Sequence, residues 1–184
     1  MCYIIRMRQT GFQLLSIIPF GSVRKELLEL LQIELANTFG LGVRIFKEQA
    51  TPHYAFSAKR NQYHSTEILE KLRQVRIEDE LILGVADVDL YVPELNFVFG
   101  EADIFSGVCI ISLVRLRQKY YGLPENEKLF FERAVKEAIH EIGHTYRLGH
   151  CKDPKCIMHF SNSIQDTDRK GPGFCNTCKT KIGL

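Results

Sequence analysis

Three histidines and one glutamate stand close together in the stretch HEIGHTYRLGHC, which runs from His140 to Cys151. His140 and His144 are four residues apart, so on a helix they lie on the same face, one turn from each other. His150 comes six residues later, and a continued helix would carry it about 240° around the axis from His144. The helix must therefore end after His144 if the third histidine is to join the first two.

This spacing is typical of a zinc site, because two imidazoles one helical turn apart can bind the same ion. Glu141 follows the first histidine and can reach a zinc-bound water without being a ligand itself. It is therefore the predicted general base, which takes a proton from that water. The apolar residues of the same helix lie on the opposite face. A solvated polar face would explain any one of the histidines but not the whole pattern.

Four of the six cysteines come next in the chain, as Cys151, Cys156, Cys175 and Cys178. Two such pairs suit a closed, tetrahedral zinc site with four thiolate ligands. A disulfide framework is one alternative, but it needs an oxidising compartment. A thioredoxin-like CxxC is another, although that motif normally lies between a strand and a helix. Because the tail is short and poor in apolar residues, we predict that a structural zinc holds it against the domain.

The composition narrows the remaining possibilities. Of the 184 residues, 45% are hydrophobic and 25% are charged, which is typical of one globular domain. The net charge of +2, without a basic run, gives no reason to expect a nucleic-acid partner. The apolar run at residues 12–20 is too short to span a membrane and has no secretory character, so we expect a cytoplasmic monomer. Cys2 and Cys109 lie in apolar runs and are expected to be buried thiols.

Hydrophobic patterns predict alternating strands and helices. Strands are expected at residues 12–20, 43–47, 80–92, 96–103 and 107–116. Helices are expected at residues 22–39, 65–75 and 127–146, the first two capped by Ser22 and Ser65, and residues 51–64 are expected to form a loop with His53 and His64 on the surface. This order indicates an α/β or α+β fold with a mixed twisted sheet and packed helices.

Several carboxylates are scattered between the predicted strands. They are Asp87, Asp89, Glu94, Glu101 and Asp103. Their spacing matches no calcium-binding loop. We therefore expect most of them to serve strand ends and turns rather than a metal.

The histidine stretch resembles the metzincin signature HExxHxxGxxH, which is followed by a methionine turn. Met158 lies eight residues after His150. The order of histidine, cysteine pair, methionine and second cysteine pair is similar to one subfamily, the archaemetzincins, and DVDLYVPELNFVFGEAD at residues 87–103 also resembles that family. At the family's glycine position this chain has Arg147. Either Arg147 adopts a left-handed conformation, at a cost of order 1 kcal/mol, or the turn shifts to Gly149.

The resemblance implies a zincin-like, two-lobed fold and a zinc metallopeptidase with two zinc ions. The catalytic zinc would be bound by His140, His144 and His150, and the structural zinc by Cys151, Cys156, Cys175 and Cys178. Met158 would form the floor beneath the catalytic zinc. The single domain, residues 1–184, would then consist of a part at about 1–149 and a cysteine-rich, zinc-bearing part at about 150–184.

A zincin binds an extended peptide along an edge strand of its sheet, so we expect a peptide or protein as substrate. Residues 107–116 are the candidate strand for this pairing. Tyr146, His159 and Asn162 are candidate donors to the charge that develops on the substrate oxygen. Two alternatives stay open: a non-catalytic zinc-binding module that contacts protein or nucleic acid through its tail, and a hydrolase of a different bond. Glu141, placed beside intact ligands, favours catalysis.

Overall fold

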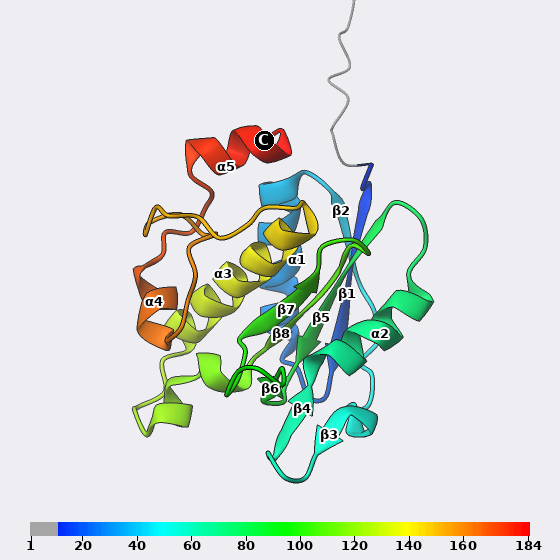
Figure 1. Cartoon of the computed structure of the whole chain (residues 1–184), viewed down its shortest axis with the longest axis vertical. Coiled ribbons are helices and arrows are strands. Elements are labelled where there is room, and N and C mark those ends of the chain that lie inside the picture. The colour runs from blue at the N-terminus through cyan, green and yellow to red at the C-terminus, as the bar shows by residue number, and fades with distance from the viewer. Residues whose placement is uncertain (1–10) are drawn as a thin grey trace, which may run out of the picture.

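A computed structural model describes residues 11–184 of the chain (Figure 1). Its main sheet has five strands in the order β2-β1-β5-β8-β7. They are β1 (Leu14–Phe20), β2 (Gly42–Ile45), β5 (Glu80–Ala86), β7 (Gly100–Asp103) and β8 (Val108–Ser112). Strands β2, β1, β5 and β8 are parallel, whereas β7 is antiparallel to β8 and forms one edge. The mixed sheet predicted from the sequence is confirmed. Cys2 lies outside the described residues.

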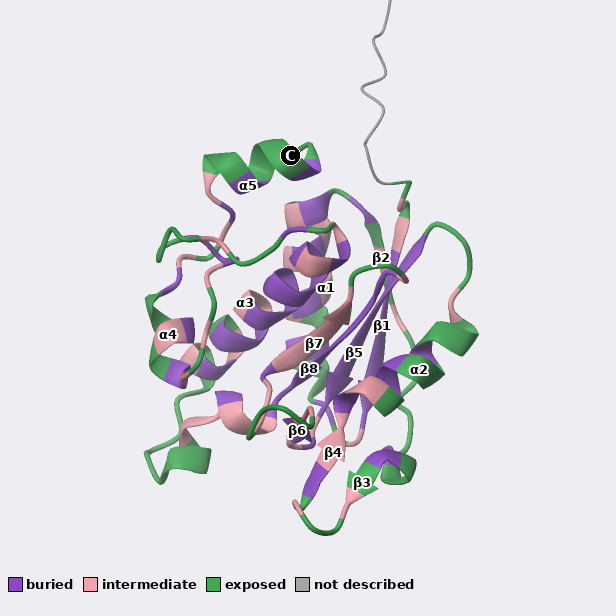
Figure 2. Cartoon of the chain, viewed as in Figure 1, coloured by how far each residue is buried: buried purple, intermediate pink, exposed green. Residues whose placement is uncertain are grey.

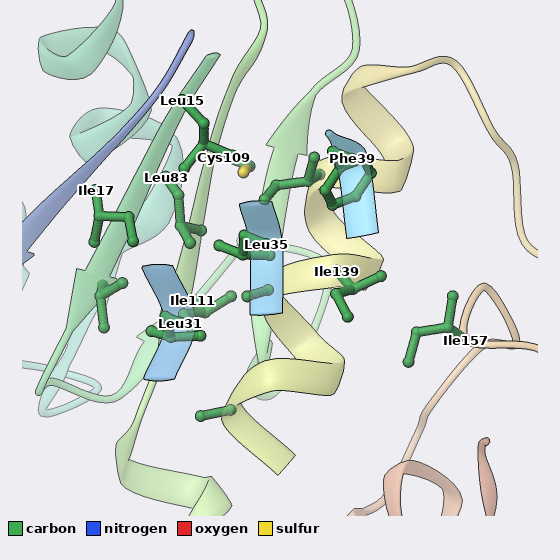
Figure 3. Packing of buried hydrophobic residues seen from close by; sticks show 14 of the residues in the cluster. Leu15, Ile17, Leu31, Leu35, Phe39, Leu83, Cys109, Ile111, Ile139 and Ile157 are labelled. Carbon is green, nitrogen blue, oxygen red and sulfur yellow. The ribbon is translucent and has the colours of Figure 1, made fainter. Parts of the chain in front are cut away.

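Helices cover both faces of this sheet. Helices α1 (Lys25–Phe39) and α3 (Glu127–Thr145) pack on one face, and α2 (Ser65–Val75) packs on the other (Figure 1). Successive strand residues point to alternate faces, so Leu83 and Ile82 belong to the two different core layers. Figure 3 shows the larger layer, in which Leu83 and Cys109 of the sheet lie near Leu35 of α1. The central strands are buried on both faces (Figure 2), which explains their nearly continuous apolar runs.

Two predicted boundaries were wrong because short strands carry little periodicity. The predicted loop at residues 51–64 contains β3 (Phe56–Ser57) and β4 (Gln62–His64), which form a small second sheet with β6 (Leu90–Tyr91). The predicted strand at residues 80–92 is divided into β5 and β6. Between them Asp87 and Asp89 form ion pairs with Arg117 and Arg115, at 2.5 and 2.6 Å.

Both predicted serine caps were also wrong, because tertiary contacts decided these helix starts. Helix α1 begins at Lys25, and its N-cap is Arg24 rather than Ser22. Ser65 is the first residue of α2, and its hydroxyl donates to the carbonyl of Tyr91 at 3.0 Å. This bond joins α2 to β6 instead of capping the helix.

The C-terminal part contains two short helices that the sequence analysis did not predict, α4 (Ile164–Arg169) and α5 (Asn176–Ile182). A capping box between Ser163 and Asp166 begins α4. Buried side chains of this part belong to the same core layer as α1 and α3, so the division near residue 150 stays a prediction. Within residues 11–184, no helix is both long and apolar enough to cross a membrane. Cys109 is buried, as predicted.

Candidate metal centres

The three histidines of the signature converge on one point. His140 and His144 project from α3, and His150 follows the end of that helix. Their candidate ligand atoms all lie within 4.8 Å of one another. The Nε2 atoms of His140 and His144 are 3.1 Å apart. Two nitrogens bound to one zinc at about 2.1 Å would be separated by about 3.4 Å, so the observed spacing fits zinc.

Backbone carbonyls orient two of these rings. Nδ1 of His140 lies 2.8 Å from the carbonyl of Ile157, and Nδ1 of His144 lies 2.7 Å from that of Leu148. A carbonyl can only accept, so each Nδ1 carries the proton and each Nε2 presents a lone pair. Two facing lone pairs are the arrangement that a metal ion between them would satisfy. Burial lowers the pKa of His140 well below its ordinary value, which keeps the ring neutral as metal binding requires.

The bend that returns His150 to the site occurs at Arg147. This residue has φ = 63°, in the left-handed region, whereas Gly149 has no positive φ. Arg147 N donates to His144 O at 2.8 Å, and Leu148 N donates to Gly143 O at 3.2 Å. These are the two bonds of a Schellman motif, which normally places glycine in the left-handed position. The chain therefore turns where the family glycine would stand, and Arg147 bears the strain.

Met158 packs beneath the helical turn that carries the first two histidines. Its side chain is fully buried, and its Cε lies 3.1 Å from the position that a Cβ on Gly143 would occupy. The sulfur lies closer still to that position. Only a glycine between the two histidines leaves this space, so the HEIGH sequence and the methionine turn fit each other. The role of Met158 as the floor beneath a zinc ion stays a prediction.

A cleft of about 550 Å³ opens beside the histidines. Its walls include α3, β7 and residues 160–162. Glu141 lies against β7, because a Cβ on Gly100 would be 2.7 Å from its Oε1. Burial raises the pKa of Glu141 well above its ordinary value, and the nearby Glu137 raises it further. A carboxylate with an increased affinity for protons suits a general base.

A buried ion pair supports the same wall of the cleft. Lys170 Nζ lies 3.3 Å from Glu137 Oε1, and the hydroxyl of Thr167 donates to that oxygen at 3.0 Å. Glu137 and Lys170 are both almost inaccessible to solvent. The sequence analysis missed this pair. Glu137 does share a helix face with Glu141, but its cation is 33 residues away in the chain.

The four cysteines form a second cluster. Their sulfur atoms lie within 4.8 Å of one another, and those of Cys151 and Cys175 are 3.8 Å apart. That is too long for a disulfide and equals the separation of about 3.8 Å expected for two thiolates at 2.3 Å from a tetrahedral zinc. The backbone N–H of Cys178 lowers the pKa of Cys175 to about 7, which favours its thiolate. The donor set and its spacing both fit zinc.

Comparison with known proteins agrees with this geometry. The model of peptidase family M54 matches residues 21–183. The chain belongs to peptidase family M54. It is 44% identical over 164 residues to an archaemetzincin from Methanocaldococcus jannaschii, which covers 89% of each chain. It is also 42% identical over 174 residues to one from Pyrococcus furiosus, with 90% of each chain covered.

Solved structures of this family have the same fold. A zinc-dependent peptidase from Methanocorpusculum labreanum superposes with a TM-score of 0.84 at 31% identity, covering 91% of this chain and 99% of that one. An archaemetzincin from Archaeoglobus fulgidus, complexed with malonate, gives 0.80 at 37% identity, covering 92% and 100%. The predicted archaemetzincin resemblance, fold class and enzyme class are confirmed. This M54 protein is a zinc metalloprotease, which favours catalysis over the non-catalytic module.

The substrate strand predicted for this M54 peptidase was wrong. The predicted strand at residues 107–116 ends at Ser112, and as β8 it pairs with β5 on one side and β7 on the other. An interior strand has no free hydrogen-bonding edge. The strand at the edge beside the cleft is β7, which the sequence placed at residues 96–103 without giving it this position.

Two of the three predicted oxygen-stabilising donors do not line the cleft. The Tyr146 ring stacks on Phe39 with a centroid separation of 5.4 Å, on the α1 side of the core. Nδ1 of His159 lies 2.9 Å from the carbonyl of Cys151. Asn162 does line the cleft. Tyr146 lies four residues after the core residue Ile142, so its ring points to the apolar face of the helix and not into the cleft.

Proposed function

We propose that this metalloprotease hydrolyses peptide bonds at the three-histidine site, with Glu141 as general base. The observation that carries this proposal is the position of Glu141, which lies against the edge strand β7 and lines the same cleft as the three histidines. His140, His144 and His150 would hold the catalytic zinc. When bound there, zinc supplies Lewis acidity, which lowers the pKa of water and polarises the carbonyl of the substrate.

The substrate would bind as an extended chain along the outer edge of β7. Ser112 N donates to Phe99 O at 2.7 Å, so the backbone groups of Phe99 face β8. Successive residues of a strand direct these groups to alternate edges, and Val98 N donates away from β8, to Leu90 O of β6, at 3.0 Å. Gly100 and Ala102 therefore direct their N–H and C=O groups outward. Among the described strands, none pairs with β7 there.

Glu141 then carries the proton through the reaction. Its carboxylate accepts a proton from the attacking water as the new C–O bond forms at the carbonyl carbon of the substrate. It donates this proton to the amide nitrogen as the C–N bond breaks, so that a carboxylic acid and an amine are released. Packing against β7 holds the carboxylate in place during both transfers.

The four cysteines would hold a second, structural zinc, and Met158 would form the floor beneath the first. Cys151 follows His150 directly, and Ile157, whose carbonyl orients His140, follows Cys156. The structural site therefore holds two segments of the chain that the catalytic site needs. We expect the enzyme to act as a cytoplasmic monomer on a peptide or protein.

A peptide-library cleavage assay tests this function. The zinc-loaded full-length protein should cut peptides internally or at an end, and elemental analysis should find two zinc ions per chain, one of them chelated more easily. Glu141→Gln is the control, and it should keep both ions and lose cleavage. If this variant cleaves as fast as the parent protein, the proposed mechanism is wrong.

A further inference from the structure

The two side-chain faces of β7 meet different surroundings. A Cβ on Gly100 would point at Glu141, so this face of the strand looks toward α3 and the histidines. Glu101, the next residue, points to the opposite face. There the hydroxyl of Thr66, on α2, donates to its carboxylate at 2.8 Å. Glu101 also lines the cleft, so this carboxylate stands on the strand that we propose binds the substrate.

Glu101, which lines the cleft, forms no ion pair with any cation of residues 11–184. Its neighbour on the same strand face, Asp103, forms an ion pair with Arg73 at 2.7 Å, and Glu137 is paired with Lys170. No comparable ion pair involves Glu101 among residues 11–184, and no lysine or arginine of this described part lines the cleft. Thr66 supplies a hydrogen bond but no charge, and a carboxylate has further lone pairs to share.

Strand geometry places one substrate side chain next to this charge. If the substrate runs antiparallel to β7 and pairs with Gly100 and Ala102, its residue opposite Glu101 forms a non-hydrogen-bonded pair. Side chains of such pairs lie on the same face and closer together than those of hydrogen-bonded pairs, with Cα atoms about 4.5 Å apart. Opposite charges at such positions attract, and like charges repel.

We propose that Glu101 is a specificity-determining residue, which selects substrates with a lysine or arginine side chain at the position opposite it. The inference rests on the peptidase function proposed above and on the pairing of the substrate with β7. It assigns the substrate class as basic, extended peptides. The selected position adjoins the residue opposite Gly100, and so lies close to the cleaved bond beside Glu141.

Matched peptides that differ at one position test this assignment. In a set with lysine, glutamine or glutamate at each position in turn, one position should show a kcat/KM for lysine about tenfold above that for glutamate at low salt. Glu101→Gln, which retains an acceptor for Thr66, should reduce this ratio to about one. Glu101→Lys should invert it. Zinc content should stay unchanged in both variants.

Glu78 provides the control, because it is an exposed carboxylate in the turn before β5 and does not line the cleft. Glu78→Gln and Glu78→Lys make the same charge changes and should leave the ratio as it is. Dissociation constants of the same peptides for zinc-loaded Glu141→Gln protein separate the two proposals. A lysine preference in binding without turnover in the parent protein would refute the peptidase mechanism alone. If peptides are cleaved but the lysine-to-glutamate ratio of kcat/KM is the same in the parent protein and in both Glu101 variants, this inference alone is refuted.

Discussion

The histidine cluster and the cysteine cluster are neighbours in the chain but are built in different ways. Two of the three histidines come from the 19-residue helix α3, which packs against the main sheet, and backbone carbonyls hold their rings. The cysteines come from two loops and from the start of α5, a helix of seven residues. Isolated helices of that length are not stable in water. The first cluster is therefore positioned mainly by the core, whereas we expect the second to need a bound metal to hold the tail in place.

This difference implies that the two sites depend on each other unequally. Two cysteines of the second cluster adjoin residues that the histidine site needs. Cys151 directly follows His150, and Cys156 directly precedes Ile157, whose carbonyl orients His140. The helix that carries His140 and His144 packs mainly against the sheet and α1, and much of this core does not involve the cysteines. We therefore expect damage at the cysteines to reach the histidines more readily than the reverse.

Loss of the general base should have the largest effect. Glu141→Gln removes the proton acceptor but keeps the shape of the side chain, so kcat should fall by about 10²–10⁴-fold. Both clusters should keep their metal, because Glu141 is not one of the histidines or cysteines that would bind it. Steady-state kinetics and elemental analysis on one preparation measure both quantities. A fall in zinc content that matches the fall in kcat would assign Glu141 to metal binding instead.

Displacing Glu141 without removing it should have the next largest effect. In Gly100→Ala, the new Cβ would lie 2.6 Å from Glu141 Cγ and 2.7 Å from Ile110 O, so the carboxylate must move. A shift of about 1 Å can cost on the order of 10²-fold in kcat. Gly42→Ala, in β2 at the opposite edge of the sheet, is the control, since its Cβ would have an ordinary contact at 3.6 Å. Equal kinetics in the two variants would mean that β7 does not position Glu141.

Removing two thiolates tests the unequal dependence directly. The double variant Cys175→Ser, Cys178→Ser should lose the structural zinc and weaken zinc binding at the histidines by about 10–100-fold, as loss of outer-shell support does. His144→Ala is the counterpart and should lose one zinc only. Zinc titration of each variant compares them. If the cysteine variant keeps normal affinity at the histidines, the two sites are independent.

Relief of strain at the bend should have the smallest effect. Arg147→Gly places glycine in the left-handed position of the Schellman motif, and should stabilise the protein by about 1 kcal/mol. For a chain of this length that corresponds to a rise in Tm of about 2–4 °C. Gly149→Ala, with open space around the new Cβ, is the comparison at the same turn, and it should not lower Tm. A lower Tm for Arg147→Gly would show that the Arg147 side chain contributes more than the strain costs.

Much of the candidate site could be predicted because its signals are local. Helical periodicity places His140 and His144 together, and the spacing of the cysteines suits one tetrahedral ion. The interior strands and the three long helices have clear hydrophobic patterns, and the structure contains them. The short strands β3 and β4 and the serine caps were predicted wrongly, because a few residues carry little periodic signal and their contacts come from distant parts of the chain.

The sequence by itself determined the residues of the candidate site: three histidines, four cysteines and one glutamate, at spacings that suit two metal ions and a general base. Those spacings are set by local helix geometry and short turns. Only the tertiary structure decided that β7, rather than β8, is the strand at the cleft, that Arg147 takes the left-handed turn, and that no cation of residues 11–184 pairs with Glu101. Each of these features depends on contacts between segments that are far apart in the sequence. Such contacts form only when the whole chain folds, so no local pattern predicts them.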